Sequence, residues 1–120
     1  MKVDTRAAVA YIVARLVRRT DFHKLLDLDN DKELKYIGPC RTGQIRVCGI
    51  DQEIEIISGS LGSSFHLFQV DDDNQIDLEI EGSTFQGFDE DSEAHFRGYI
   101  QGHVLEFYDF ADDSRTRYMF

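Results

Sequence analysis

From Gln44 to the C-terminus, apolar and polar residues alternate with a period of two, and this alternation constrains the fold more than any other feature. Residues 75–81 read QIDLEIE, in which Ile76, Leu78 and Ile80 alternate with acids. Such alternation is typical of a strand with one face in the core and one in water. Seven other segments have a similar pattern: GQIRVCGI, QEIEIIS, SSFHLFQV, TFQGFD, AHFRGYI, HVLEFYDF and RTRYMF. Their short connections predict antiparallel neighbours in a meander.

An internal repeat lies within this region. The segments FHLFQVDD (65–72), FQGFDEDS (85–92) and FYDFADDS (107–114) share the pattern F-x-x-F-x-x-D-[DS], at spacings of 20 and 22 residues. We interpret each unit as a strand, an acidic turn and a returning strand.

An Ile-x-Gly triplet recurs at 57–59, 80–82 and 100–102. Glycine supplies the positive φ that a tight hairpin turn requires, so each triplet is predicted to mark a turn. With residues 101 and 102 as a two-residue loop, Phe96 would face Phe107, an aromatic cross-strand pair. The same register would place Arg97 opposite Glu106, a pair of opposite charges.

The N-terminal segment predicts a helix over residues 4–19. Asp4 and Thr5 are candidate N-caps, and the apolar residues that follow recur at helical spacing. Arg15, Arg18 and Arg19 fall on the other side, near the end where the helix dipole favours cations. We therefore expect an amphipathic helix with a basic outer face, although these arginines could instead contact the acidic remainder of the chain.

Residues 21–43 allow two interpretations. They could extend the helical region or form a hairpin that turns at DNDK, before the break marked by Gly38 and Pro39. The whole chain of 120 residues has the length and the apolar content, 42%, of a single domain with its own core. We predict one domain, 1–120, comprising the helix (4–19), this connecting region and the meander (44–120).

Charge is distributed unevenly along the chain. The formal net charge is −10, yet residues 1–20 hold five basic side chains and one acid. Residues 47–96 hold 13 acids and neither lysine nor arginine. Such a surface disfavours nucleic acid and anionic membranes, so we expect neither as a partner. It suits a basic protein, or it serves only solubility.

Three acidic turns are predicted at the same end of the hairpins. Clustered carboxylates can bind Ca²⁺, so the weak metal candidates are Asp71, Asp73, Asp91 and Asp113. None of these turns matches an EF-hand loop, and Asp and Ser side chains also stabilise turns by bonding nearby backbone amides. We favour turn formation, and expect no metal and no cofactor.

Catalytic motifs are not found in the sequence. There is no G-x-S-x-G, no phosphate-binding loop and no metal-type histidine spacing among the four histidines. Cys40 and Cys48 are predicted to be free thiols in a reducing compartment. The longest apolar run, residues 7–14, is too short for a transmembrane helix, which needs about 20 residues. These features favour a non-catalytic cytoplasmic protein.

The sequence thus predicts an α+β fold: an N-terminal amphipathic helix packed on or plugging a predominantly antiparallel meander of about six to eight strands. The meander is expected to curl into a roll or open barrel, because long twisted sheets curl. The preferred function is an acidic protein–protein interaction module, of the inhibitor or immunity type or self-associating. The candidate partner-binding residues are Asp77, Glu79, Glu81, Asp89 and Glu90. The alternative is a roll that binds a small apolar ligand, with weak enzymatic activity.

Overall fold

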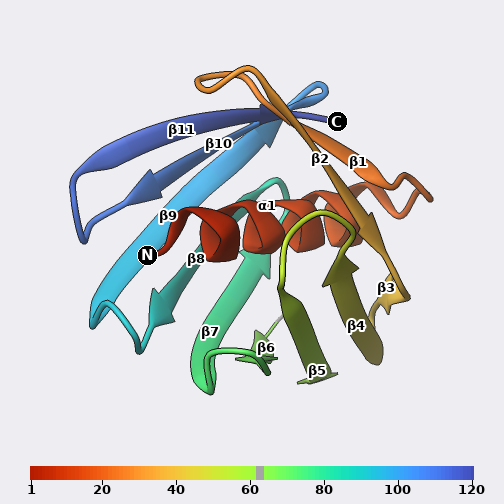
Figure 1. Cartoon of the computed structure of the whole chain (residues 1–120), viewed down its shortest axis with the longest axis vertical. Coiled ribbons are helices and arrows are strands. Elements are labelled where there is room, and N and C mark those ends of the chain that lie inside the picture. The colour runs from red at the N-terminus through yellow and green to blue at the C-terminus, as the bar shows by residue number, and fades with distance from the viewer. Residues whose placement is uncertain (62–63) are drawn as a thin grey trace.

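The computed structural model describes residues 1–61 and 64–120, and the side chains of all of these except 59–61. It contains one helix, α1 (Val3–Arg18), surrounded by strands (Figure 1). The strands, in chain order, are β1 (Lys24–Asp27), β2 (Lys32–Ile37), β3 (Cys40–Arg41), β4 (Gln44–Gly49), β5 (Glu55–Leu61), β6 (Ser64–Gln69), β7 (Asn74–Glu81), β8 (Thr84–Asp89), β9 (Ala94–Gln101), β10 (Val104–Asp109) and β11 (Ser114–Met119).

The strands form one antiparallel sheet in the order β2-β1-β11-β10-β9-β8-β7-β6-β5-β4-β3. An additional pairing of β2 with β4, Tyr36 opposite Gly49 and Ile37 opposite Cys48, closes ten of them into a barrel. The short β3 pairs with the remaining part of β4. The predicted α+β meander is therefore confirmed. Residues 21–43, left open by the sequence, form the hairpin and supply the strands that close the sheet.

The helix fills the inside of this barrel (Figure 1). Its residues from Thr5 to Arg15 are all buried, and those from Ala8 to Ala14 have no exposed surface. A helix that is apolar on all sides is suited to full burial, and the four alanines among residues 7–14 keep it thin. The interior of a barrel widens with the number of strands, so ten strands leave room for this helix.

The predicted basic outer face of the helix is wrong for Arg15. Only 6% of this residue is exposed, and its guanidinium donates hydrogen bonds to the Tyr11 hydroxyl (2.7 Å) and to the Phe22 carbonyl (3.2 Å). Arg15 also forms an ion pair with Asp21 (2.9 Å). A buried arginine requires partners of this kind, because an unpaired buried charge is costly. Arg18 and Arg19 are exposed, as expected.

The predicted helix N-cap is also wrong. The N-cap position is occupied by Lys2, which makes no side-chain capping bond. The side chain of Thr5 instead points to the sheet, where its hydroxyl donates to Gln69 Oε1 (2.7 Å). Lys2 forms an ion pair with Asp72 (2.7 Å). These contacts attach the first turn of the helix to the β6–β7 turn, so tertiary contacts replace local capping.

Four-residue loops join the strands of four hairpins, at 28–31, 70–73, 90–93 and 110–113. In each loop the last residue has positive φ: Asp31, Asp73, Glu93 and Asp113. In three of them the strand residue before the loop is a buried aspartate whose carboxylate accepts hydrogen bonds from loop amides. The structural repeat is therefore a hairpin of 20 residues from β6 onward.

This structure corrects the alignment of the third repeat and the hairpin register. By position in its strand, Leu105 is the equivalent of Phe65 and Phe85, so the third unit is shifted by two residues from the predicted 107–114. Gly82 and Gly102 do occupy turns with positive φ, but Gly59 lies within β5.

The loop of the β9–β10 hairpin is Gly102-His103, which lies between the paired residues Gln101 and Val104. Glycine at the first loop position is typical of a type II′ turn, whereas the predicted register required it at the second. The pairs are consequently Arg97 with Tyr108 and Glu106 with Tyr99. Phe96 and Phe107 still stack, as diagonal neighbours, with 5.1 Å between ring centroids.

Two inward-facing glycines make room for aromatic rings in the core. Gly98 pairs with both Phe85 and Phe107, and Gly87 pairs with Phe96. A Cβ atom on Gly98 would lie 2.0 Å from the Glu106 carbonyl oxygen and 2.4 Å from the Phe85 ring. The rings therefore cover the glycines, a pairing that stabilises curved sheets.

We predict that Gly98→Ala lowers the free energy of unfolding by about 1–3 kcal/mol, because the added methyl group overpacks the core. Urea denaturation would measure this change. The control is Gln101→Ala, at an exposed position of the same strand, which should change stability by less than about 0.5 kcal/mol. Equal stability of the two variants would contradict the packing described here.

We also predict a loss of stability in alkali. Burial raises the pKa of the Cys40 thiol and that of the Tyr118 hydroxyl to about 12, and raises that of Tyr36 as well. Above pH of about 9 the unfolded chain releases these protons while the folded chain keeps them, so the free energy of unfolding falls as pH rises. Urea denaturation at pH values between about 7 and 11 would show it. A flat profile over that range would contradict the prediction.

Candidate functional site

The outer face of the sheet carries a cleft of about 750 Å³ over β7 to β11. Its walls include Glu79 and Glu81 on β7, Arg97 and Tyr99 on β9, and Phe110 after β10. A neighbouring hollow of about 510 Å³ extends over β6 and shares four residues with the cleft: Glu79, Gln86, Arg97 and Phe110. We call the two hollows together the outer cleft. Their volumes are within the range of ligand-binding pockets.

Antiparallel pairing arranges the side chains of the outer cleft in cross-strand rows. One row consists of Glu79, Gln86, Arg97, Tyr108 and Arg115, one residue from each of the strands β7 to β11. On either side of it lie the rows Asp77, Phe88, His95 and Thr84, Tyr99, Glu106. Because strand residues alternate between faces, every member of these rows projects outward.

Hydrogen bonds and ion pairs connect side chains within these rows and between them. The Tyr99 hydroxyl donates to Glu106, whose other carboxylate oxygen lies 2.9 Å from Nε of Arg115. The guanidinium carbon of Arg97 lies 5.4 Å from the centre of the Phe110 ring, a cation–π contact. These contacts hold aromatic rings and arginines in defined positions while leaving them accessible. Tyr99 is 45% exposed and Phe110 is 43% exposed.

Two acidic side chains of the outer cleft have no basic partner among the described ion pairs. Glu79 accepts a hydrogen bond from the Gln86 amide (3.2 Å), and Glu81 appears in no ion pair among the described side chains. Arg115, in contrast, is neutralised by Glu106. With four acids and two arginines in its lining, the outer cleft has a formal charge of −2 beside exposed aromatic rings.

Carboxylates also raise the pKa of two tyrosines at this surface. The hydroxyl of Tyr99 donates to Glu106, and the negative charge of that carboxylate opposes ionisation, so the pKa of Tyr99 is raised. Tyr108 donates to Asp113 Oδ1 (3.0 Å), which raises its pKa in the same way. Both tyrosines thus remain neutral hydrogen-bonding groups at physiological pH.

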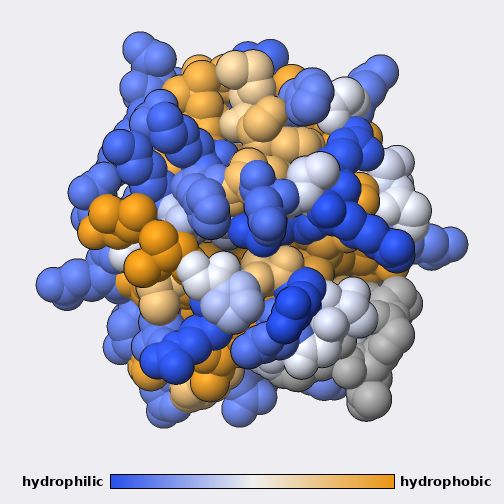
Figure 2. Space-filling model, turned by 90° about the vertical axis from the view of Figure 1, so that its right-hand side faces the viewer, coloured by the Kyte–Doolittle hydropathy of each residue, from blue (hydrophilic) through white to orange (hydrophobic). Residues whose placement is uncertain are grey.

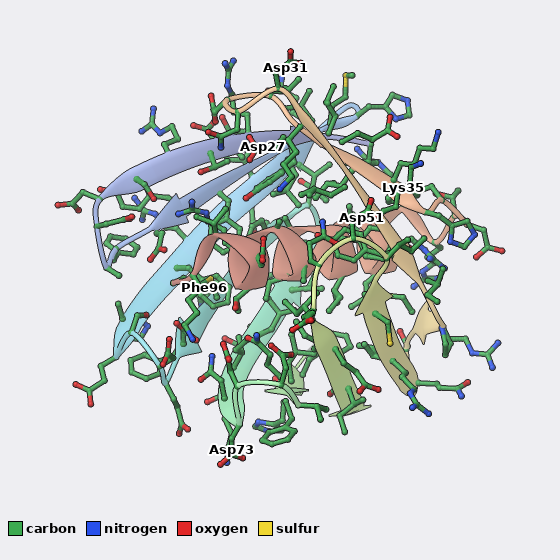
Figure 3. The ribbon with its side chains drawn as sticks, in the orientation of Figure 1. Asp27, Asp31, Lys35, Asp51, Asp73 and Phe96 are labelled. Carbon is green, nitrogen blue, oxygen red and sulfur yellow. The ribbon has the colours of Figure 1, made fainter. Side chains whose placement is uncertain are left out.

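The acidic turns lie around one end of the barrel and do not meet. The loops at 28–31, 50–54, 70–73, 90–93 and 110–113 all lie at the end near the start of α1. Figure 3 shows Asp31 and Asp73 at opposite edges of the molecule with Asp51 between them. Within residues 1–61 and 64–120, no group of three or more His, Cys, Asp or Glu side chains could hold a metal ion.

The four candidate metal ligands make other contacts or stand apart. The Asp71 carboxylate accepts hydrogen bonds from the Glu55 amide (3.0 Å) and the Gln69 side chain (2.9 Å). Asp113 accepts from Tyr108, while Asp73 and Asp91 are exposed loop residues. The turn-forming interpretation of the acidic loops agrees with these contacts.

The candidate partner-binding residues are only partly brought together. Asp77, Glu79 and Glu81 all project outward from β7, and each lines the outer cleft. Glu90 is exposed in a loop at the barrel end. The surface position expected for Asp89 is wrong: this residue is 1% exposed, and its carboxylate accepts hydrogen bonds from Asn74, at the start of β7, and from Ser92, in the loop that follows β8. It is therefore buried away from any partner.

The aromatic side chains of the outer cleft were not among the binding residues predicted from the sequence. The repeated F-x-x-F pattern could have indicated these outward-facing rings. Two residues three apart on a strand project to opposite faces, so in the units at 65–72 and 85–92 the first ring lies inside and the second outside. Accordingly Phe85 is buried, while Phe88 is partly exposed on the outer face.

Within the described residues, no helix is long and apolar enough to cross a membrane. Comparison with protein-family models, with curated proteins and with solved structures finds no match for this chain.

We predict that Glu106→Gln lowers the pKa of Tyr99, because the substitution removes the negative charge that opposes ionisation. Tyrosine ring carbon shifts, followed by NMR during an alkaline titration, would measure it. Asp113→Asn is the matched control, which should lower the pKa of Tyr108 and leave that of Tyr99 unchanged. If both variants affect Tyr99 equally, the hydrogen bond to Glu106 is not the cause.

Proposed function

We propose that this chain is a non-catalytic protein-binding module whose binding surface is the outer cleft. The observation that carries the proposal is the combination of exposed aromatic rings and arginines with a concave shape. Tyrosine and arginine are enriched among the residues that dominate binding energy at protein interfaces. Tyr99, Tyr108 and Arg97 line the larger hollow together, in positions held by contacts with their neighbours.

The partner that best fits this surface is a basic segment of another protein. Glu79 and Glu81 would accept its lysines or arginines, while Tyr99 and Phe110 would pack against their aliphatic parts or against apolar neighbours. The net charge of −10 and the ring of acidic loops would accelerate the encounter with a basic partner by long-range attraction. An inhibitor or immunity-type protein that covers a cationic site would act in this way.

A ligand inside the barrel is not part of this proposal, because α1 fills the interior. We also propose a cytoplasmic location, which the two free thiols, Cys40 and Cys48, support.

Selection from a random peptide library displayed on phage, with the intact protein as bait, tests the proposed function. We expect the selected peptides to be rich in lysine and arginine and to lose affinity as salt concentration rises. Their dissociation constants should increase about tenfold or more for Tyr99→Ala and for the double variant Glu79→Gln/Glu81→Gln.

Two matched controls locate the effect. Ile37→Ala removes an exposed apolar side chain from β2, and Asp51→Asn removes an exposed charge from a loop. Neither residue lines the outer cleft, so neither change should weaken binding. Selected peptides that bind every variant equally, or that are neutral and insensitive to salt, would overturn the proposal.

A further inference from the structure

A second cavity, of about 560 Å³, lies where α1 ends, at the end of the molecule opposite to the acidic loops. It is lined by the arginines Arg15, Arg19 and Arg41 and by a single acid, Asp21. Figure 2 faces this end of the molecule and shows hydrophilic side chains interrupted by hydrophobic patches. Three guanidinium groups around one cavity are unexpected in a chain with a net charge of −10.

Arg15 forms the inner wall of this cavity. The residue is 6% exposed, and its buried Nε has no hydrogen-bond partner. The other two nitrogens of its guanidinium are held by Tyr11, the Phe22 carbonyl and Asp21. Asp21 has a side chain that is 91% exposed, so solvent weakens its neutralising effect. The cavity thus contains a fixed, incompletely neutralised positive charge.

The other two arginines approach from separate segments. Arg19 follows the last turn of α1 with a φ of 54°, the left-handed conformation that glycine usually occupies at a helix end. The side chain of Arg19 lines the cavity. Arg41 belongs to β3, and one of its terminal nitrogens donates to Gln44 (2.9 Å), which leaves its other donors available.

We propose that this cavity binds a small molecule that carries a phosphate group. Three arginines and one aspartate give the cavity a formal charge of +2. This positive charge would balance the negative charge of a phosphate monoester, which is about −2 near pH 7. The guanidinium fork is suited to phosphate oxygens. Thr20 and Thr42 also line the cavity, and a threonine hydroxyl can donate a hydrogen bond.

The cavity is larger than a phosphate ion requires, which indicates that the ligand has a further body. Leu16 and Pro39 supply apolar lining for it. Burial raises the pKa of the neighbouring Cys40 to about 12, so this thiol adds no negative charge that would repel an anion. The ligand class is therefore a phosphate monoester with a small apolar or aromatic group.

Titration calorimetry with phenyl phosphate, inorganic phosphate and benzyl alcohol tests the inference on the intact protein. We expect saturable binding of phenyl phosphate, weaker binding of inorganic phosphate and none of benzyl alcohol. Arg19→Gln and Arg41→Gln should each weaken phenyl phosphate binding about tenfold. Asp21→Asn should strengthen it, because Asp21 competes with the ligand for Arg15.

Arg18→Gln is the matched control. Arg18 is adjacent to Arg19, but its side chain donates to the Gly102 carbonyl (2.6 Å) and does not line the cavity. Its substitution should leave affinity unchanged. Equal weakening by Arg18→Gln and Arg19→Gln would indicate nonspecific attraction and overturn the proposal. The absence of saturable phenyl phosphate binding would overturn it as well. Tyr99→Ala separates this site from the outer cleft, since it should not affect phosphate binding.

Discussion

The packing of one apolar helix inside a closed sheet is the constraint on which the rest of this structure depends. Ten strands enclose a space that strand side chains alone would not fill, and α1 occupies it with side chains mostly no larger than valine or isoleucine. The helix and the barrel therefore stabilise each other. Polar contacts at both helix ends, from Thr5 to Gln69 and from Arg15 to Phe22, fix its position along the barrel.

Filling the interior with a helix directs functional chemistry to the outside of the sheet. The inward positions of β8 to β10 are taken by Phe85, Phe96 and Phe107, which pack over two glycines. The outward positions of the same strands are free to hold Arg97 and Tyr99. The outer cleft is formed from these positions, so core packing and the proposed binding surface use opposite faces of the same strands.

The meander also separates charge between the two ends of the molecule. Acidic loops, four of them with four residues, lie at the end where α1 begins, whereas the cavity at the other end is lined by three arginines. The dipole of α1 agrees with this separation of charge, because its positive end, at the start of the helix, lies among the acidic loops. The two proposed sites thus differ in charge as well as in position, and each suits a ligand of opposite sign.

Much of the fold was predictable from the sequence, because its signals are local. Period-two alternation identified the strands from residue 44 onward, and β7 has the predicted buried and exposed faces. Strand registers were harder to predict. Moving Gly102 from the second to the first loop position changes every residue pair in the β9–β10 hairpin, but each residue stays on the same face of the sheet. The burial of Arg15 was unpredictable from helical spacing, since its partners, Phe22 and Asp21, follow the end of the helix.

The sequence by itself determined the element types of residues 4–19 and 44–120, the antiparallel order of the meander and the acidic composition of its loops. Each of these depends on residues close together in the chain. Only the tertiary structure decided that β2 pairs with β4, that the helix lies inside, and that the acidic loops remain apart around one rim. It also decided which side chains share a cavity, as Arg19 and Arg41 do. These outcomes depend on barrel closure, which joins segments distant in sequence and has no local signal.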